Sequence, residues 1–432
     1  MSKGVSKSVA IIGGGSAGIA TCRFLKAAGH RIRLLDAGST FGGIWAPQPS
    51  NDVVYNNLTT NLPTVVMQSF DVDFSAKVPS YVTPTQLGEY LESYAEFSGA
   101  AENAELGATV TAVSRCRDGW EVSWEKGGQH HCEEFDCVAV ANGHFNKPYM
   151  PKIPGQDEWL SGDSRRRVLH ARDYREPTAF AGVSVLVVGG RSSGVDIARE
   201  LRSTVSSLYV LAKGGSQVFR EGHCAYVPVG ASLRRDGYLQ LEGGVVEGAA
   251  VDVVLLATGY QYEFPFLDTD SLGMRVERYV TPMYLHCLHA TFPTLAFIGL
   301  PQSVPCPITA FEAQARYIAA FWAGKVQTSE QDRYEWVEAR KAQVGERMQD
   351  MHMTGDTTWS YIVDLIRLSG VQGEELDRIE RRVSVVQEIY RDRVSKQSKI
   401  PWGDDWYRRC SYGVDWNLGR WWVEDLPEVA RL

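Results

Sequence analysis

A short apolar run, a glycine-rich turn and a helical segment follow one another at the start of the chain and restrict its fold more than any other feature. Residues 9–12 predict a β-strand, and residues 19–28 predict a helix that ends at Gly29. In such a turn the first glycine allows a tight bend, the second lets the backbone approach a pyrophosphate, and the third lets helix and strand pack closely. The segment therefore predicts a dinucleotide-binding βαβ unit, against the alternative of a glycine turn that binds nothing.

A carboxylate follows at the position that this unit requires. The next apolar run, residues 32–35, ends at Asp36, about 20 residues after the turn, where an acid accepts hydrogen bonds from a ribose hydroxyl. Unpaired N–H groups at the helix N-terminus favour an anion at the same place. The residues that we assign to this first nucleotide are Gly13, Gly15, Ser16, Ala17, Gly18 and Asp36.

The glycine turn recurs in altered form near the middle of the chain. Residues 183–188 predict a strand that leads into a second turn and helix, but an arginine stands where the middle glycine would be. The next strand, residues 208–212, ends at a lysine rather than at an acid. A cation without a carboxylate accommodates a 2′-phosphate, so we predict an NADP(H) site, with a solvated loop lysine as the alternative. The residues assigned to this second nucleotide are Gly189, Arg191, Ser192, Ser193, Gly194 and Lys213.

Composition and charge exclude several classes of partner. The formal net charge of −8 provides no basic face for nucleic acid or for an anionic membrane. No window has the ~18 uncharged apolar residues of a membrane span, and the N-terminal residues lack the apolar core of a signal peptide. The eight cysteines have neither C-x-x-C nor zinc-type spacing, which suits reduced thiols. We therefore expect a cytoplasmic enzyme with no nucleic-acid or membrane partner.

Two groups of histidines have structural interpretations that we prefer to metal binding. His130 and His131 stand beside Cys132, but no fourth ligand is near them in the sequence, so we expect a solvated turn. His286 and His289 lie in a mostly apolar segment, where buried structural histidines are commoner than ligands. No metal site is predicted.

Three further segments carry weaker signals. Glycines at positions 42 and 43 let the backbone run close to a flat ligand that Trp45 could cover, although a loop anchored by a core tryptophan explains the same residues. Asn61, in the polar stretch 55–63, is from spacing alone more simply a turn former. The tryptophans after residue 400 are expected to pin an irregular tail onto the body of the protein.

Taken together and in this order, these segments resemble the flavin-containing monooxygenases, which belong to the class B flavoprotein monooxygenases. The resemblance runs from about residue 9 to residue 324 and includes residues 42–45, 55–63, 142–144, 257–260 and 312–316. It implies FAD at the first turn and NADPH at the second. It also assigns cofactor contacts to Gly43, Trp45, Thr60, Tyr174, Thr258, Gly259 and Gln314.

One family segment departs from its usual form. His170 and Tyr174 supply the H-x-x-x-Y half of the signature F-x-G-x-x-x-H-x-x-x-Y, but Leu160 replaces the phenylalanine and the gap before His170 is longer than the pattern has. The departure concerns the linker between domains rather than the chemistry. Tyr174, where Baeyer–Villiger members usually carry tryptophan, favours the branch that oxygenates nitrogen and sulfur.

The resemblance implies a mechanism in which the cofactors supply the reactive chemistry. NADPH passes a hydride to FAD, the reduced flavin takes up O2 as a C4a-hydroperoxide, and a soft nitrogen or sulfur of a small amine or sulfide takes one oxygen atom. Such chemistry needs no acid, nucleophile or metal from the protein. The resemblance gives Asn61 the catalytic role of holding the oxygenated flavin in a water-poor pocket.

Three other functions stay open on the sequence. A Baeyer–Villiger monooxygenase that acts on a ketone is the nearest alternative. An NADPH-dependent flavin reductase, disulfide reductase or oxidase shares the plan with two nucleotides, but a disulfide reductase would need a reactive cysteine pair. A non-enzymatic flavin-binding protein would not need the second nucleotide turn.

The expected fold is α/β, with two Rossmann-like domains of which one is inserted in the other. Residues 1–157 and 284–432 form the expected FAD domain, whose second part includes a helical, tryptophan-rich C-terminal tail, and residues 158–283 form the NADPH domain. The active site is expected in the cleft between the domains. A homodimer is compatible with the sequence, which does not specify the oligomeric state.

Overall fold

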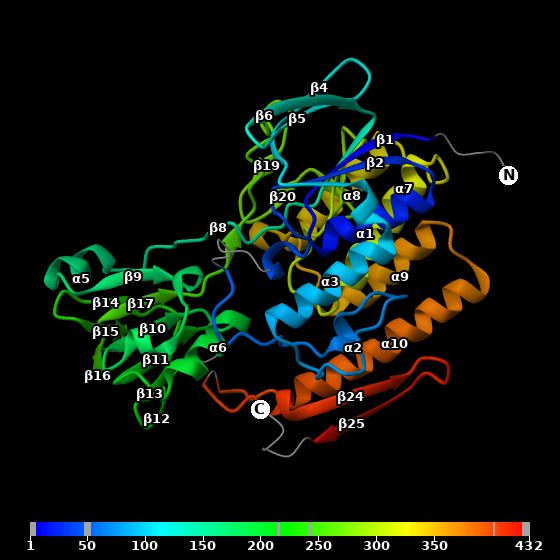
Figure 1. Cartoon of the computed structure of the whole chain (residues 1–432). Coiled ribbons are helices and arrows are strands. Elements are labelled where there is room, and N and C mark those ends of the chain that lie inside the picture. The colour runs from blue at the N-terminus through cyan, green and yellow to red at the C-terminus, as the bar shows by residue number, and fades with distance from the viewer. Residues whose placement is uncertain (1–5, 47–52, 214–216, 242–243, 401, 426–432) are drawn as a thin grey trace.

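The computed structural model describes residues 6–46, 53–213, 217–241, 244–400 and 402–425. These residues form two α/β lobes, which we call the first and second domains (Figure 1). Figure 1 shows the second domain at the left, in green, and the first domain at the right with the C-terminal hairpin beneath it. The predicted α/β fold with two sheets of parallel strands is confirmed.

The first domain is built on a seven-stranded sheet. Its central strands are parallel, and two short antiparallel strands close one edge. In spatial order the strands are β21 (Met283–Tyr284), β22 (Leu288–His289), β23 (Leu295–Phe297), β7 (Cys137–Val140), β1 (Ser8–Ile12), β2 (Arg31–Asp36) and β3 (Ala104–Leu106).

Strand β1 shows why the apolar runs in the sequence are continuous. Val9 and Ile11 pack on one face of the sheet, while Ala10 and Ile12 pack on the other. Successive side chains of a strand point to opposite faces, so a strand covered on both sides must be apolar at every position. The helices that cover the first face include α1 (Ser16–Ala27), α3 (Pro84–Ser98), α4 (Ala100–Asn103) and α7 (Pro307–Trp322).

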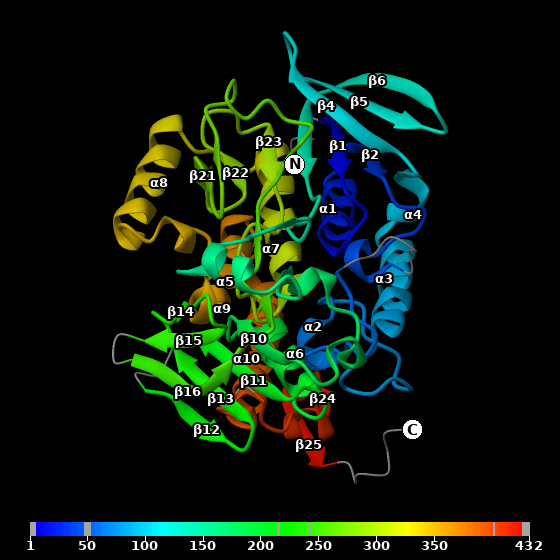
Figure 2. The same cartoon turned by 90° about the vertical axis from the view of Figure 1, so that its left-hand side faces the viewer.

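The opposite face is covered by an antiparallel meander and by the chain that returns from the second domain. The meander consists of β4 (Thr109–Arg115), β5 (Trp120–Lys126) and β6 (Gln129–Phe135). It lies at the end of the molecule remote from the second domain (Figure 2). His130, His131 and Cys132 therefore lie in β6, so the expected turn at these residues is wrong, and the turn lies at glycines 127 and 128 instead.

Helix α3 forms because its ends carry strong local signals. Thr83 and Gln86 make a reciprocal capping box, Pro84 occupies the first turn, and Gly99 takes a left-handed conformation at the C-terminus. One face of the helix is buried in the core of the first domain, at Leu87, Tyr90, Leu91 and Tyr94.

The second domain repeats the plan with a six-stranded sheet. Short helices α5 (Gln156–Gly162) and α6 (Ser192–Leu201) accompany it, and a small antiparallel sheet of β14 (Ser232–Leu233), β15 (Tyr238–Leu241) and β16 (Gly244–Ala250) extends it. The main strands in spatial order are β12 (Phe219–Glu221), β13 (Cys224–Pro228), β11 (Ser207–Ala212), β10 (Ser184–Val188), β17 (Val253–Leu256) and β9 (Arg167–His170).

The chain crosses between the domains twice, at two short strands that pair with each other. These strands are β8 (Lys147–Pro148) and β18 (Tyr260–Gln261). Ile153 and Trp159 already pack in the core of the second domain, whereas Tyr262 and Phe264 pack in the core of the first. The crossings therefore lie earlier in the chain than the expected boundaries at 157/158 and 283/284. Apolar residues 262–280 look alike in either domain, so the sequence did not reveal where they pack.

The C-terminal part adds helices to the first domain and then a β-hairpin. The helices are α8 (Glu330–Val344), α9 (Thr358–Leu368) and α10 (Gly373–Ser395), and the hairpin strands are β24 (Cys410–Asp415) and β25 (Arg420–Asp425). The expected irregular tail is thus wrong for residues 410–425. Trp402 is buried against the second domain, as a pinning residue would be, but Trp422 is 50% exposed. None of the helices in the described residues is long and apolar enough to cross a bilayer.

Candidate functional site

The two glycine turns have the same backbone geometry. Gly13 has φ = +116° and its N–H donates to Leu35 at 2.8 Å, while Gly189 has φ = +122° and donates to Leu211 at 2.8 Å. A Cβ at either glycine would lie 2.3 Å from a backbone oxygen, that of Ala141 or that of Ala257. Both the positive φ and the contact exclude a side chain, so these positions are fixed as glycine.

The third glycine of each turn is fixed by the helix that follows. A Cβ at Gly18 would lie 1.8 Å from the carbonyl oxygen of Gly13, and one at Gly194 would lie 2.0 Å from that of Gly189. The first turns of α1 and α6 therefore lie directly against the strands that precede them. This is the close packing of helix and strand that the sequence pattern predicts.

The middle position is different because its backbone needs no glycine. Gly15 and Arg191 are both extended, with φ of −75° and −94°. A Cβ at Gly15 would have 3.6 Å to its nearest neighbour, the Cα of Gly43, which is ordinary contact. The structure itself thus tolerates a side chain at Gly15, and its absence leaves the surface of the turn open to a ligand. Arg191 instead reaches across to the first domain, where its guanidinium donates to the Ser303 hydroxyl at 2.9 Å.

The second glycine segment of the sequence lies on the first turn. The Gly42 N–H donates to the Gly14 carbonyl at 3.1 Å, and a Cβ at Gly43 would lie 3.2 Å from the Cα of Gly15. Trp45 follows in a short 3₁₀ helix (Gly43–Trp45) and is partly buried against the core. Residues about thirty positions apart therefore form one glycine-lined surface at the start of α1.

Asp36 lies beside the same turn, at the carboxyl end of β2. One carboxylate oxygen accepts the N–H of Gly14, and the other accepts that of Gly38 at 2.7 Å. Burial raises the pKa of Asp36, while the two N–H donors act in the opposite direction. The carboxylate is only partly buried, so it stays accessible to a ribose hydroxyl at the edge of the turn.

Both helices present N-termini suited to an anion. No side chain caps α1 at Gly15 or α6 at Arg191, and neither first turn contains an acidic residue. Ser16 and Ala17 begin α1, and Ser192 and Ser193 begin α6. An uncapped N-terminus without a competing carboxylate is the feature that binds phosphate groups. The residues present therefore fit a dinucleotide at each turn.

Asn61 connects the first domain with the helix that follows the second turn. Its side-chain amide donates to the Ser192 hydroxyl, the first residue of α6, at 2.9 Å. The loop that carries it is fixed by Thr60, whose backbone N–H donates to Val82 at 2.9 Å and whose hydroxyl accepts the N–H of Val82. A residue of the first domain thus contacts the helix N-terminus that the sequence assigns to the second nucleotide.

Tyr174 and Gln314, which were expected to contact a cofactor, are buried in the protein. Tyr174 is 1% exposed, and its hydroxyl donates to Glu200 on α6 at 2.7 Å. Gln314 is fully buried on α7, where its oxygen accepts the N–H of Gly299 and its nitrogen donates to Tyr361. Neither side chain has surface left for a cofactor, which corrects the direct contact expected of them.

The remaining expected residues lie at the carboxyl ends of the strands of the second sheet. Lys213 follows β11 and is exposed. Thr258 and Gly259 follow β17 and contact the crossing between the domains. The Thr258 hydroxyl donates to the Tyr149 carbonyl at 2.5 Å, and the Gly259 carbonyl accepts the N–H of Tyr149. The same Gly259 carbonyl lies 3.1 Å from His170 Nε2. The longer gap before His170 forms a turn at Asp163, whose carbonyl accepts the N–H of Arg166 and whose carboxylate accepts that of Arg165.

The buried histidines are structural, as expected. His286 and His352 lie 3.0 Å apart through their Nδ1 atoms, and His289 accepts the N–H groups of Thr291 and Phe292. Burial lowers the pKa of His289 and of His352 to about 4. Across the described part of the chain, no group of three or more His, Cys, Asp or Glu side chains is arranged to hold a metal ion.

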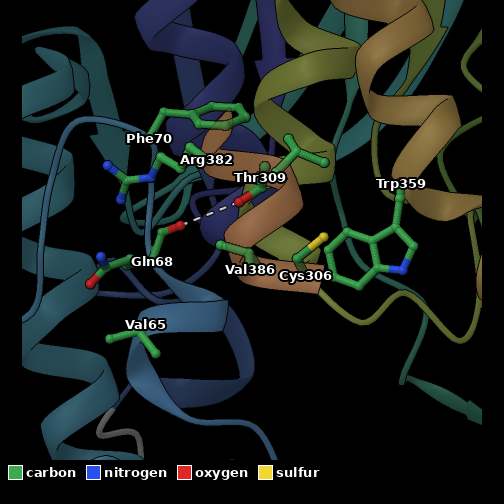
Figure 3. Close-up of a pocket in the computed structure, with 9 residues that line it drawn as sticks. Val65, Gln68, Phe70, Cys306, Thr309, Trp359, Arg382 and Val386 are labelled. Atoms are coloured by element: carbon green, nitrogen blue, oxygen red, sulfur yellow. Dashed lines mark hydrogen bonds between the residues drawn. The ribbon is translucent and has the colours of Figure 1, made fainter. Parts of the chain in front are cut away.

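A narrow pocket lies where α2 (Thr64–Met67), the N-terminal end of α7, α9 and α10 meet (Figure 3). Its walls are mostly apolar, and the Thr309 hydroxyl donates to the backbone carbonyl of Gln68 beside it at 3.3 Å. The residues that line it are Val65, Gln68, Phe70, Cys306, Thr309, Trp359, Arg382, Val383 and Val386.

No sequence pattern points to two charged residues that the fold brings to the site. Asp196 on α6 and Arg408 near the C-terminus form a salt bridge of 2.9 Å beside the loop that carries Asn61. They are more than two hundred residues apart in the sequence, and Arg408 belongs to no recognisable motif. Only the docking of the C-terminal segment brings them together.

Known proteins with related sequences share this organisation. A family model described as flavin-binding monooxygenase-like matches residues 6–230 and 237–374. Senecionine N-oxygenase of Tyria jacobaeae is 29% identical over 389 residues, which cover 84% of this chain and 82% of that protein. Flavin-containing monooxygenase FMO GS-OX-like 2 of Arabidopsis thaliana is 30% identical over 371 residues, which cover 78% of each protein.

The fold agrees with these relatives. The solved structure of S-allyl-L-cysteine S-oxygenase from Allium sativum superposes with a TM-score of 0.81 and 27% identity, over 94% of this chain and 95% of that one. The match extends across both domains. The chain therefore belongs to the flavin-binding monooxygenase-like family.

Proposed function

We propose that this protein is an NADPH- and FAD-dependent monooxygenase that transfers one oxygen atom from O2 to a soft nitrogen or sulfur of a small molecule. When bound, the two cofactors supply the redox chemistry, because NADPH reduces the flavin and the reduced flavin activates O2. The observation that supports the proposal is the hydrogen bond between Asn61 of the first domain and Ser192, the first residue after the second nucleotide turn.

The residues of the first turn would hold FAD. Gly15 and Gly43 provide an open backbone surface, and the uncapped start of α1 provides N–H groups for the pyrophosphate. Asp36 would accept a ribose hydroxyl at the edge of that surface. The protein would position the nucleotide without contributing a nucleophile or a metal.

The residues of the second turn would hold NADPH. Ser192 and Ser193 begin an uncapped helix, and Lys213 is exposed at the end of the neighbouring strand β11. The cation and the missing carboxylate favour a 2′-phosphate at this position. The preference for NADPH over NADH therefore rests on Lys213.

Asn61 would act where the two nucleotides meet. It is partly buried and already donates one N–H to Ser192, so its amide is oriented before any ligand arrives. A preoriented donor in a site with little water stabilises developing negative charge and holds oxygen-derived groups in place. We therefore give Asn61 the catalytic role.

The nature of the relatives supports the substrate class. The similar proteins include an enzyme named as an N-oxygenase and another named as an S-oxygenase. Nitrogen and sulfur lone pairs are both soft nucleophiles, and one electrophilic oxygen donor serves either. The sequence has no C-x-x-C pair, which gives no support to a disulfide reductase.

The test uses the purified protein with its flavin, NADPH and ¹⁸O2. A thioether, a tertiary amine and a cyclic ketone are offered separately, and the product is analysed by mass spectrometry while NADPH oxidation is recorded. We expect one ¹⁸O atom in the sulfoxide or the N-oxide. A labelled lactone alone would establish Baeyer–Villiger activity, and NADPH oxidation without any labelled product would refute the oxygenase proposal.

A further inference from the structure

The segment from Trp402 to Tyr412 spans both domains, and we call it the C-terminal strap. At its start, Trp402 is buried in the core of the second domain and its indole N–H donates to Glu221 at 2.8 Å. At its end, Tyr412 is buried in the core of the first domain and its backbone N–H donates to the Ser80 hydroxyl at 2.8 Å. The strap is therefore anchored on each side of the crossing between the domains.

Arg408 lies between these anchors and faces the loop that carries Asn61. Its Nε donates to the carbonyl of Thr60 at 3.1 Å, and one terminal nitrogen donates to the carbonyl of Thr59 at 3.3 Å. The same guanidinium donates to Asp196 on α6 at 2.9 Å and to Asp405 at 3.0 Å. All three nitrogens of the guanidinium are thus engaged, and its side chain is only 9% exposed.

Asp196 is the residue of the second domain to which Arg408 donates. Besides Arg408, its carboxylate accepts the Tyr55 hydroxyl at 3.2 Å and Arg199 at 2.9 Å. Tyr55 belongs to the same stretch of the first domain as Thr59 and Asn61. The Tyr55 hydroxyl and the Arg408 guanidinium, which lie far apart in the sequence, therefore both donate to the buried Asp196 carboxylate of α6.

Bonds to backbone carbonyls restrain a loop in a way that a simple ion pair does not. A planar guanidinium can donate to two neighbouring carbonyls and to a carboxylate at once, with each direction fixed. An ammonium group is a compact charge on a flexible stem, so it can pair with Asp196 without orienting both carbonyls. The contacts of Arg408 thus require arginine and not only a positive charge.

We propose that Arg408 is a positioning residue that fixes the loop of Thr59, Thr60 and Asn61 against α6. Through it, the C-terminal strap sets the distance and direction of the Asn61 amide relative to the second nucleotide turn. The geometric part of the proposal stands on the contacts of Arg408 alone. Its catalytic consequence rests on the function proposed above.

The test compares Arg408→Lys and Arg408→Gln with the matched control Arg409→Gln. Arg409 is the next residue of the same 3₁₀ helix (Trp406–Arg409) and pairs with Asp404 at 2.9 Å. Hydrogen–deuterium exchange is measured on peptides that contain residues 55–62 in the flavin-loaded protein without NADPH or substrate. We expect at least several-fold faster exchange in both Arg408 variants and unchanged exchange in the control.

The lysine variant keeps the proposal testable if the glutamine variant does not fold. It retains a cation beside Asp196, so we expect its thermal midpoint to stay near that of the wild type while the loop exchanges faster. Unchanged loop exchange in a folded Arg408→Lys protein would overturn the positioning role. Equally fast exchange in Arg409→Gln would do the same, because it would show a general loosening of the strap.

A second readout follows the consequence for turnover. In the Arg408 variants we expect NADPH oxidation to continue while a several-fold larger share of it yields hydrogen peroxide instead of oxygenated product. If the wild type itself forms no oxygenated product, the proposed function fails but the exchange result stands. If the wild type is well coupled and both Arg408 variants are equally well coupled, the catalytic consequence is refuted.

Discussion

The side-chain amide of Asn61 donates to the hydroxyl of Ser192 at 2.9 Å, and the two residues belong to different domains. Ser192 is the first residue of α6, directly after the second nucleotide turn. A change in the loop that carries Asn61 can therefore alter the start of α6 through a single hydrogen bond. Together with the bonds of Arg191 to Ser303 and of Arg408 to Asp196, this contact holds the start of α6 against the rest of the chain.

Replacing Asn61 with alanine separates flavin binding from oxygenation. We expect Asn61→Ala to retain flavin, because Asn61 lies outside the first turn, and to lose most product formation, roughly 10-fold or more, because an oriented donor is removed. Product and NADPH oxidation are measured together. Asn56→Ala is the control, since Asn56 is exposed on the same loop and contacts Glu176 at 3.4 Å. Unchanged product yield in Asn61→Ala would remove the catalytic assignment.

Two glycines of the first turn are expected to respond differently to alanine. Gly15→Ala fits the structure without a clash, so we expect less than about 1 kcal/mol loss of stability, as for a helix N-cap residue, but weaker flavin binding. Gly18→Ala places a Cβ 1.8 Å from a backbone oxygen, and we expect a loss of folding stability of about 1–3 kcal/mol or more.

The measurements for this pair are urea unfolding of the flavin-free proteins and titration with FAD. If Gly15→Ala binds FAD as tightly as the wild type, the pyrophosphate does not lie against Gly15. If Gly18→Ala is as stable as the wild type, the close packing of α1 on the turn is not rigid.

Lys213→Ala tests the preference for the phosphorylated nucleotide. We expect the KM for NADPH to rise roughly 10-fold, because a charge-assisted hydrogen bond contributes about 1.5–3 kcal/mol, and the KM for NADH to change little. Lys152→Ala, which removes an exposed lysine paired with Asp157 at 2.9 Å, is the control. Equal changes for the two nucleotides would show that Lys213 does not contact the 2′-phosphate.

The buried histidines predict that the protein loses stability in mild acid. Burial lowers the pKa of His144, His289 and His352 to about 4, whereas a histidine in the unfolded chain titrates near 6.5. The unfolded chain therefore binds protons first as the pH falls. Stability is complete above about pH 6.5 and decreases towards pH 4.

Urea unfolding midpoints measured at intervals between pH 7 and pH 4.5 check this slope. We expect His352→Gln to show a shallower loss than the wild type, because one of the neutral buried rings is gone. His130→Gln, which removes an exposed histidine of β6, controls for the loss of a histidine. A slope in His352→Gln as steep as that of the wild type would contradict the assignment to this ring.

Local patterns were enough to place the elements that surround the site. The strand, turn and helix at Gly13 and at Gly189 form as predicted, because positive φ and contact with a carbonyl oxygen leave glycine as the only solution. Arg191 shows the limit of the pattern: its position needs no glycine, so the residue found there depends on what the turn faces. Tyr174 and Gln314, to which the sequence assigns cofactor contacts, are buried and hydrogen-bonded within the protein.

By itself, the sequence determined the α/β class, the two nucleotide turns and the order of the domains, because these depend on short-range periodicity and backbone sterics. Only the tertiary structure decided where residues 262–280 pack, that the tail ends in a hairpin, and that Arg408 and Asp196 meet beside Asn61. These outcomes depend on contacts between segments far apart in the chain. A local sequence pattern does not specify which distant segment a residue will contact.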